Sequence, residues 1–111
     1  MRRGLSGYRL MWMAVLFDLP VVTRDERKAA TDFRLRLLDF GFEMAQFSVY
    51  MRFCISSHQA ETLAERVASE LPKAGKVNII FFTDKQYERI LSFHGGSPQA
   101  GKKPPPQFEL F

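Results

Sequence analysis

The feature that most constrains the fold is an unbroken apolar run over residues 11–17, which ends at Asp18-Leu19-Pro20. A run of this length without a polar residue is typical of a strand buried on both faces of a sheet. It is too short to cross a membrane, which takes about 20 apolar residues. The run therefore predicts a central strand whose C-terminal end presents the carboxylate of Asp18.

The composition fits one globular domain. The chain has 111 residues, of which 46% are hydrophobic and 25% are charged, enough for a single packed core. Its one cysteine, Cys54, and its two widely separated histidines, His58 and His94, exclude a disulfide framework, a zinc cluster and an HExxH metal helix. Any metal must then be held by carboxylates. Cys54 alternates with predicted core residues, which disfavours a catalytic thiol, and both histidines are expected to be structural or exposed.

The net charge of +4 and the pI near 9.5 favour an anionic partner, and nucleic acid fits this balance better than an acidic protein surface. Arg2 and Arg3 precede the apolar run as in a signal peptide, but Asp18, Pro20 and Arg24 follow it without a small-residue cleavage site. We therefore expect a cytoplasmic protein with no membrane contact.

A helix is predicted from Arg24 to Phe40. Thr23 and Glu26 have the spacing of a capping box at its start, and Gly41 stands where a left-handed residue commonly ends a helix. Between them, apolar residues recur at helical spacing: Ala29, Ala30, Phe33, Leu37 and Phe40. The segment from Phe42 to Ile55 then alternates as strands do, but its phase changes at Ala45-Gln46, which predicts either a bulge or a tight reversal between two strands.

Ser56 and Ser57 offer caps for a second helix that Pro72 would end, and two further strands are predicted, over residues 77–82 and, more weakly, 88–93. The order is strand, helix, strand, strand, helix, strand, with one additional C-terminal strand. This order predicts an α+β, ferredoxin-like fold, in which an antiparallel sheet carries both helices on one face.

The chain divides into three parts. We assign residues 1–10 to an N-terminal extension and residues 11–94 to the ferredoxin-like domain. Residues 95–111 form a tail rich in Gly, Pro and Lys that ends in a short apolar peptide.

Asp18 is the sharpest candidate for a site residue. A carboxylate at the exit of a buried strand is poorly solvated and needs hydrogen bonds, a cation or a proton. Two copies facing each other across a dimer axis would repel, and a shared divalent cation would relieve this repulsion and polarise a phosphodiester. The alternative is that Asp18 caps the turn before Pro20 by accepting backbone N–H bonds.

The first predicted helix also carries a basic strip opposite its core face, made of Arg24, Arg27, Lys28 and Arg34, with acidic residues on a neighbouring strip. Aligned cations can follow one nucleic-acid backbone. The alternative is a solvated face with local ion pairs. An RNA-recognition module shares the strand and helix order but is set aside, because its Lys/Arg-Gly-aromatic strand motif is absent.

Several segments carry a family resemblance: residues 13–20 (MAVLFDLP), Gly41-Phe42, residues 46–50 (QFSVY), residues 75–77 (GKV) and residues 83–86 (TDKQ). With the basic helix, they resemble the CRISPR-associated protein 2 family, in the version found beside type II systems, from about Trp12 to Phe93. The resemblance implies a homodimer in which the last strand adds to the partner's sheet. It also implies that the dimer bridges the CRISPR integrase, CRISPR-associated protein 1, while new spacer DNA lies across it.

The resemblance also implies roles for individual residues. Asp18 corresponds to the family's metal ligand and nuclease residue, so the implied cofactor is Mg²⁺ shared between two subunits. Arg24, Arg27 and Lys28 take the place of DNA contacts. Ser48 lies in the Ser-Val-aromatic motif, where a backbone or phosphate contact is expected. Residues 1–10 precede the family's usual start.

Three functions are in play: an adaptation scaffold that holds duplex DNA, a magnesium-dependent endonuclease that cuts RNA or DNA, and a toxin-like RNase of the same fold. One obvious carboxylate per subunit is thin support for a two-metal phosphodiesterase. We therefore expect the scaffold first and the nuclease second.

The C-terminal peptide, residues 107–111 (QFELF), resembles the Gln-x-x-Leu-Phe motif that binds the bacterial sliding clamp, and the prolines before it would present it away from the domain. The alternative is that Phe108, Leu110 and Phe111 dock on the integrase or on the partner protomer.

Overall fold

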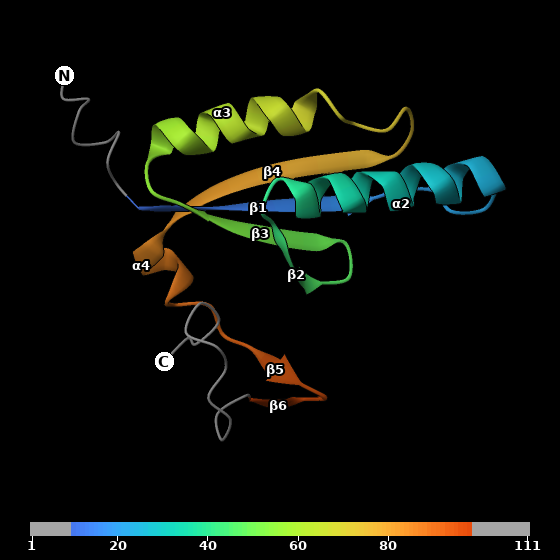
Figure 1. Ribbon diagram of the computed structural model, residues 1–111. Coiled ribbons are helices and arrows are strands. Elements are labelled where there is room, and N and C mark those ends of the chain that lie inside the picture. The colour runs from blue at the N-terminus through green and yellow to red at the C-terminus, as the bar shows by residue number, and fades with distance from the viewer. Residues whose placement is uncertain (1–9, 99–111) are drawn as a thin grey trace.

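The computed structural model describes residues 10–98, which form a four-stranded antiparallel sheet with two long helices on one face (Figure 1). The strand order is β2-β3-β1-β4. The elements are β1 (Met11–Asp18), α2 (Arg24–Asp39), β2 (Glu43–Gln46), β3 (Val49–Cys54), α3 (Ser57–Ala68) and β4 (Lys76–Thr83). This is the predicted ferredoxin-like arrangement.

Strand β1 lies in the middle of the sheet, paired with β3 on one side and β4 on the other. Met13, Val15 and Phe17 face the helices, and Trp12 and Ala14 face the other way. All five side chains are buried. The unbroken apolar run therefore has the predicted cause, because side chains on both faces of this strand are buried.

The core lies between the sheet and the two helices. Helix α2 contributes Phe33 and Leu37, while α3 contributes Ala60, Leu63 and Val67. Burying apolar side chains is the main favourable term in folding, at about 1.5–3 kcal/mol for each of the large ones. The helices are thereby fixed on one face and leave the opposite face of the sheet open.

Both predicted ends of α2 are confirmed. The Thr23 hydroxyl accepts the Glu26 N–H at 3.0 Å, and a Glu26 carboxylate oxygen accepts the Thr23 N–H at 3.0 Å, which completes the capping box. At the other end Gly41 has a φ of +89°, and the Phe42 N–H donates to the Leu37 carbonyl at 3.0 Å. A left-handed glycine closes a helix in this way because it has no Cβ to clash.

The phase change between residues 42 and 55 has two sources. The chain reverses at Phe47-Ser48 between β2 and β3, and the β2 register is also irregular between Met44 and Gln46. Helix α3 begins after its Ser56 cap as predicted, but it ends at Ala68 rather than at Pro72.

The strand predicted over residues 88–93 is wrong in extent and place. Thr83 and Gln86 form a second capping box, which starts the short helix α4 (Asp84–Tyr87) between the two predicted strands. Only Phe93–His94 (β5) is a strand, and it pairs with Ser97–Pro98 (β6) in a hairpin separate from the main sheet (Figure 1). In place of the one additional strand that was predicted, the structure has this short hairpin.

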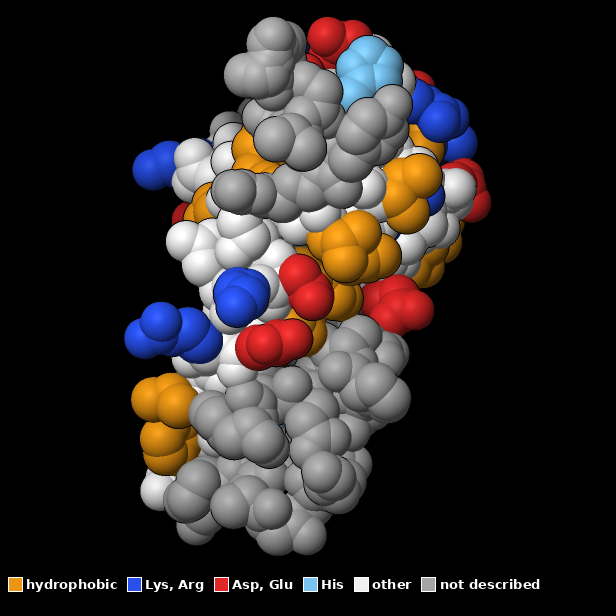
Figure 2. Space-filling view, turned by 90° about the vertical axis from the view of Figure 1, so that its left-hand side faces the viewer, with side chains coloured by type: hydrophobic (Ala, Val, Ile, Leu, Met, Phe, Trp, Pro, Cys, Tyr) orange, Lys and Arg blue, Asp and Glu red, His pale blue; other side chains and the backbone are white. Residues whose placement is uncertain are grey.

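Helix α4 packs against the face of the sheet that α2 and α3 leave open, because the Tyr87 ring stacks on Trp12. Beside it, acidic, basic and hydrophobic side chains share one surface, so this end of the molecule is of mixed charge (Figure 2). No helix within residues 10–98 is long and apolar enough to span a membrane. The assignments made for residues 1–9 and 99–111, including Phe108, Leu110 and Phe111, lie outside the described residues.

Candidate nucleic-acid and metal site

Asp18 is the last residue of β1, where the strand runs out beyond the core. Its side chain is exposed, so the expectation of a poorly solvated carboxylate is wrong. Within residues 10–98 it makes no hydrogen bond and no ion pair, so the predicted alternative of a cap on the turn before Pro20 is not observed either. Asp18 is a free, solvated carboxylate in the described chain.

Two neighbours on β4 define the surroundings of Asp18. Lys76 is its register partner in the antiparallel pair, and directly opposite residues point to the same face. Gly75 has a φ of +98°, and a Cβ there would stand 2.8 Å from the Asp18 carbonyl oxygen and 2.7 Å from a Leu19 methyl carbon. Only glycine fits this approach, which fixes the backbone of Asp18 while its side chain stays open.

The turn between β2 and β3 lies at the same end of the sheet. The Phe17 N–H donates to the Ser48 carbonyl at 3.0 Å, and Ser48 has a φ of +65°, which is uncommon for a residue with a side chain. The observed role of Ser48 is therefore in the backbone of this turn. Its neighbour Phe47 is 89% exposed, although the alternating pattern placed it among the apolar strand positions.

The residues around Asp18 can be tested against the chemistry of Mg²⁺. This ion takes oxygen ligands and is commonly held by one or two carboxylates together with waters and substrate phosphates. In residues 10–98 no three His, Cys, Asp or Glu side chains gather where they could hold a metal. A single subunit thus offers Asp18 alone, with the cation of Lys76 opposing a metal beside it. Within residues 10–98 the donor set is therefore the minimum that Mg²⁺ uses, one carboxylate completed by waters and phosphates, and a second carboxylate from a partner subunit would strengthen it.

The basic strip of α2 has features of both predicted alternatives, local ion pairs and cations that are available to a phosphate. Lys28 pairs with Asp32 at 2.9 Å, and a guanidinium N–H of Arg27 donates to the Val22 carbonyl at 2.7 Å. Arg34 donates to the Thr31 hydroxyl at 3.3 Å. Arg24 makes no hydrogen bond or ion pair with its side chain in the described chain. Local pairing therefore accounts for Lys28, and Arg24 is the cation most available to a phosphate.

Cys54 is fully buried in the core. Burial raises the pKa of the Cys54 thiol, and the neighbouring Arg52 opposes this only in part. A thiol of this kind stays protonated at neutral pH, whereas the nucleophilic form of cysteine is the thiolate. The geometry thus supports the prediction that Cys54 belongs to the core.

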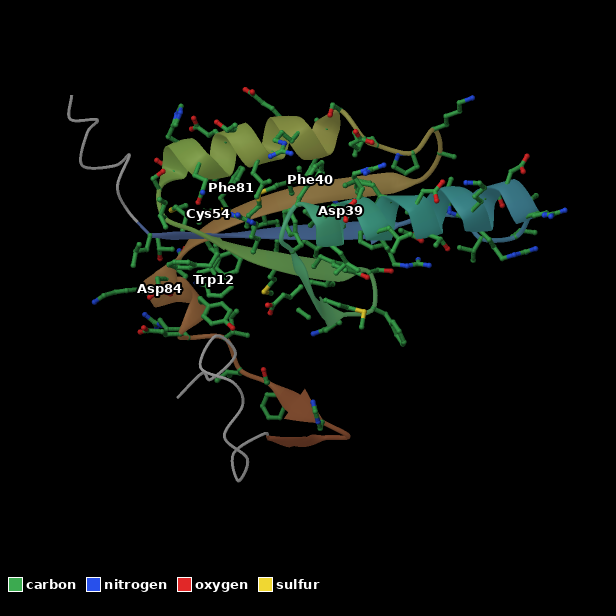
Figure 3. All side chains as sticks on the ribbon, in the orientation of Figure 1. Trp12, Asp39, Phe40, Cys54, Phe81 and Asp84 are labelled. Carbon is green, nitrogen blue, oxygen red and sulfur yellow. The ribbon has the colours of Figure 1, made fainter. Side chains whose placement is uncertain are left out.

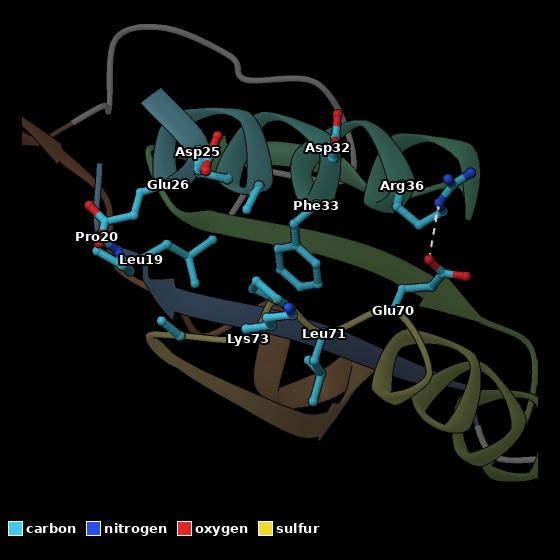
Figure 4. Close-up of a pocket in the computed structure, with 14 residues that line it drawn as sticks. Leu19, Pro20, Asp25, Glu26, Asp32, Phe33, Arg36, Glu70, Leu71 and Lys73 are labelled. Atoms are coloured by element: carbon cyan, nitrogen blue, oxygen red, sulfur yellow. Dashed lines mark ion pairs between the residues drawn. The ribbon is translucent and has the colours of Figure 1, made fainter. Parts of the chain in front are cut away.

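A groove of about 440 Å³ lies between α2 and the segment that follows α3 (Figure 4). Its floor is apolar, with Leu19, Phe33 and Leu71. Arg36 and Glu70 face each other across it at 3.5 Å. Further carboxylates line the wall: Asp25, Glu26 and Asp32. These acidic groups make the groove unsuited to phosphate.

Comparison with known proteins identifies the family. The family model described as CRISPR associated protein Cas2 matches residues 11–90, which include Asp18, the basic strip and the Ser48 turn. The chain belongs to this family.

Individual relatives agree with this assignment. A protein of Paracidovorax avenae is 64% identical over 107 residues, covering 96% of this chain and 99% of its own length. A protein of Flavobacterium psychrophilum is 48% identical, covering 96% and 93%. Both are named CRISPR-associated endoribonuclease Cas2. A solved structure titled "Crystal structure of cas2" aligns with a TM-score of 0.48 at 22% identity, over 67% of this chain and 76% of that one.

Proposed function

We propose that this member of the Cas2 family is an adaptation component that, as a homodimer, bridges subunits of the CRISPR integrase and holds duplex DNA for integration. The observation that carries the proposal is the imbalance of charge at the site. One free carboxylate, Asp18, stands beside Lys76, while three cations of the α2 strip have no carboxylate partner in the described chain: Arg24, Arg27 and Arg34. Such a surface suits the binding of phosphates better than the assembly of a metal cluster.

The open face of the sheet supports the homodimer. On this face β1 carries Trp12, Ala14 and Leu16, flanked by the partly exposed side chains of Phe53 and Ile80. No helix of the described chain covers it apart from α4 at the Trp12 end (Figure 1). Apolar surface of this kind commonly marks a protein interface.

A second copy packed on this face would also supply a second carboxylate for a metal ion. Leu16 and Asp18 have the same parity along β1, so Asp18 lies at the edge of the open face. Two subunits packed there can bring their Asp18 side chains toward each other. A Mg²⁺ ion bound between them would polarise a phosphodiester, and Asp18 of each subunit would hold it.

A nuclease that cuts RNA or DNA with Mg²⁺ is the second candidate, with a toxin-like RNase as its RNA-specific form. It is favoured by the name endoribonuclease, which the curated relatives carry, together with the free carboxylate of Asp18. In this reading the reaction would depend on Asp18, and the integrase would not be required.

The test compares the unmodified protein with Asp18→Ala. Each is mixed with purified integrase and a short duplex, and integration is measured; each is also incubated alone with RNA or DNA and Mg²⁺. We expect the variant to integrate normally and to form the same dimer by light scattering. Loss of integration by an intact dimer would show that Asp18 belongs to the mechanism, and cleavage by the unmodified protein alone that Asp18→Ala abolishes would favour the nuclease.

For the C-terminal peptide we keep the sliding clamp as the proposed partner, with the integrase or the partner protomer as the alternative. The double variant Leu110→Ala, Phe111→Ala removes two of its three apolar anchors. A pull-down with purified clamp separates these possibilities. Equal recovery of the variant and the unmodified protein would reject the clamp.

A further inference from the structure

A second groove of about 400 Å³ lies between the end of α2, the strand β3 and the helix α3. Figure 3 places Phe40 in this region, beside α3. Two arginines line it, and the described residues contribute no carboxylate to its lining. The lining is Phe40, Arg52, His58, Gln59, Thr62, Leu63 and Arg66. This is the opposite of the acidic groove beside Glu70.

Arg52 occupies an unusual place for a cation, on the face of the sheet that the helices cover. It pairs with the buried residue Met13 in the register of β3 with β1. Its guanidinium donates to the Phe53 carbonyl at 3.2 Å and contacts the Cys54 sulfur at 3.8 Å. Gly41 makes room for it, because a Cβ there would stand 2.8 Å from the Arg52 Nε atom. A guanidinium has five N–H donors, so most of those of Arg52 have no protein acceptor within residues 10–98.

The guanidinium of Arg66 is positioned by an aromatic ring rather than by hydrogen bonds. Its guanidinium carbon lies 4.8 Å from the centre of the Phe40 ring, in a cation–π contact. Its side chain makes no hydrogen bond or ion pair in the described chain, whereas Arg36 pairs with both Asp39 and Glu70. The stacking orients the planar guanidinium without using its donors. Arg66 is thus preorganised and still able to bind an anion.

The other polar side chains of the groove add hydrogen-bond donors. The Gln59 side-chain oxygen accepts the Ile55 N–H at 2.9 Å, which leaves the amide NH₂ of Gln59 to donate. His58 and Thr62 are exposed on the same side of α3. The glutamates of this helix, Glu61 and Glu65, are outside the lining. Because the side chains of this groove are cations and hydrogen-bond donors, a matching ligand carries negative charge and several acceptor oxygens.

We propose that this groove binds the phosphodiester backbone of a nucleic-acid strand, at a site separate from the basic strip of α2. A strand fits better than a single small anion, because the groove is open and its donors come from two elements, β3 and α3, with the Phe40 ring at the end of α2 beside them. Arginine forks match phosphate oxygens in bidentate geometry. The inference rests on the proposed function only in taking nucleic acid as the partner; the groove itself is independent of Asp18.

The first test uses Arg66→Gln, at an exposed position of α3, and Arg89→Gln as a control that removes one exposed positive charge just after α4. Binding of a short fluorescent duplex is measured by anisotropy over a series of salt concentrations. We expect Arg66→Gln to weaken binding several-fold at low salt and to reduce the slope of log K against log salt by about 1, as loss of one phosphate contact should. Equal slopes for Arg66→Gln and Arg89→Gln would overturn the proposal.

A second test locates the contact. Single-stranded oligonucleotide and, separately, inorganic phosphate are titrated into labelled protein, and the amide NMR signals of Gln59, Thr62 and Arg66 are followed. Shifts with the oligonucleotide that Arg52→Gln abolishes are expected, with the fold of that variant checked by its remaining spectrum. Shifts with phosphate alone, or none with either, would reject the strand assignment.

These results are separable from the proposed function. If Arg24→Gln weakens duplex binding and Arg66→Gln does not, the groove is rejected while the role of α2 stands. If the unmodified protein fails to support integration yet Arg66→Gln changes the salt slope, the proposed function is rejected and the groove stands.

Discussion

The two ends of β1 differ in what surrounds their polar groups. At one end Trp12 is 7% exposed, its ring is stacked on Tyr87 with centroids 3.9 Å apart, and its indole N–H donates to Asp84 at 2.9 Å. At the other end Asp18 is exposed, and its carboxylate makes no hydrogen bond or ion pair within residues 10–98. Strand β1 thus begins in a buried aromatic cluster at Trp12 and ends in a solvent-exposed carboxylate at Asp18.

This difference separates structural aspartates from available ones. The Asp84 carboxylate accepts the only N–H of the indole, a group that would lose its partner if Asp84 were removed. The Asp18 carboxylate accepts no hydrogen bond in the described chain, so it is available to bind a cation or a partner subunit. Substitutions at the closed end should therefore act on stability, and substitutions at the open end on binding.

The largest effect is expected from Trp12→Ala. The change empties the space between Tyr87, Phe53 and the sheet, and loss of a buried tryptophan typically lowers the free energy of unfolding by about 3–5 kcal/mol. Urea unfolding followed by circular dichroism measures it. Phe47→Ala is the matched control, because Phe47 is 89% exposed and its loss should change stability by less than about 0.5 kcal/mol. If the two variants lost similar free energies of unfolding, the conclusion that the Trp12 end of β1 stabilises the fold would be contradicted.

The two aspartates provide the next comparison. Asp84→Ala leaves the Trp12 indole N–H without its acceptor, which should lower the free energy of unfolding by about 1–3 kcal/mol. Asp18→Ala breaks no contact in the described chain and should change it by less than about 0.5 kcal/mol. The same urea experiment measures both. A destabilised Asp18→Ala would mean that this carboxylate has a structural partner, such as a second subunit.

The closed end should also make stability depend on pH. Burial, assisted by the Asp84 and Glu43 carboxylates, raises the pKa of Tyr87. An unfolded tyrosine loses its proton near pH 10, while folded Tyr87 still holds it, so stability is full below that pH and falls above it. The slope attributable to this one proton is about 1.4 kcal/mol per pH unit. Tyr87→Phe keeps the stacked ring and should flatten the curve in urea unfolding at alkaline pH; parallel curves would exclude Tyr87 as the cause.

Local signals were enough to predict much of the fold. The apolar run marked β1, Thr23 and Glu26 marked the start of α2, and Gly41 marked its end, because each depends on residues adjacent in the chain. Helix α4 has an equally clear capping box in Thr83 and Gln86. It was missed because only one turn follows, and that turn is held by Tyr87 stacking on Trp12, a contact between opposite ends of the domain.

The site shows the same limit. The position of Asp18 at a strand end could be predicted from the sequence, but its exposure could not, because exposure depends on where the helices stop covering the sheet. The cationic groove gave no local signal. Arg52 and Arg66 meet there only because β3 and α3 lie side by side beyond the end of α2, and Gly41 leaves space for the Arg52 side chain.

The smallest effect concerns the open end, where Lys76 stands opposite Asp18. Directly opposite residues of an antiparallel pair have Cβ atoms about 4.5–5.5 Å apart, so the ammonium group is near any cation that Asp18 would bind. Charges at a solvated edge interact weakly and are screened by salt. Lys76→Gln should therefore raise the affinity for Mn²⁺, used as a probe for Mg²⁺, by a few-fold at low salt and less at high salt, as measured by water proton relaxation.

Two variants sharpen this prediction. Lys73→Gln removes an exposed lysine from the acidic groove and should leave Mn²⁺ affinity at the Asp18 end unchanged. In the Asp18→Ala background, Lys76→Gln should have no effect, because the carboxylate that it influences is gone. An increase in affinity that persists without Asp18 would place the ion elsewhere. If Lys76→Gln does not raise the Mn²⁺ affinity when Asp18 is present, the Lys76 ammonium group lies away from the Asp18 carboxylate. Its positive charge would then not limit the use of Asp18 as a metal ligand.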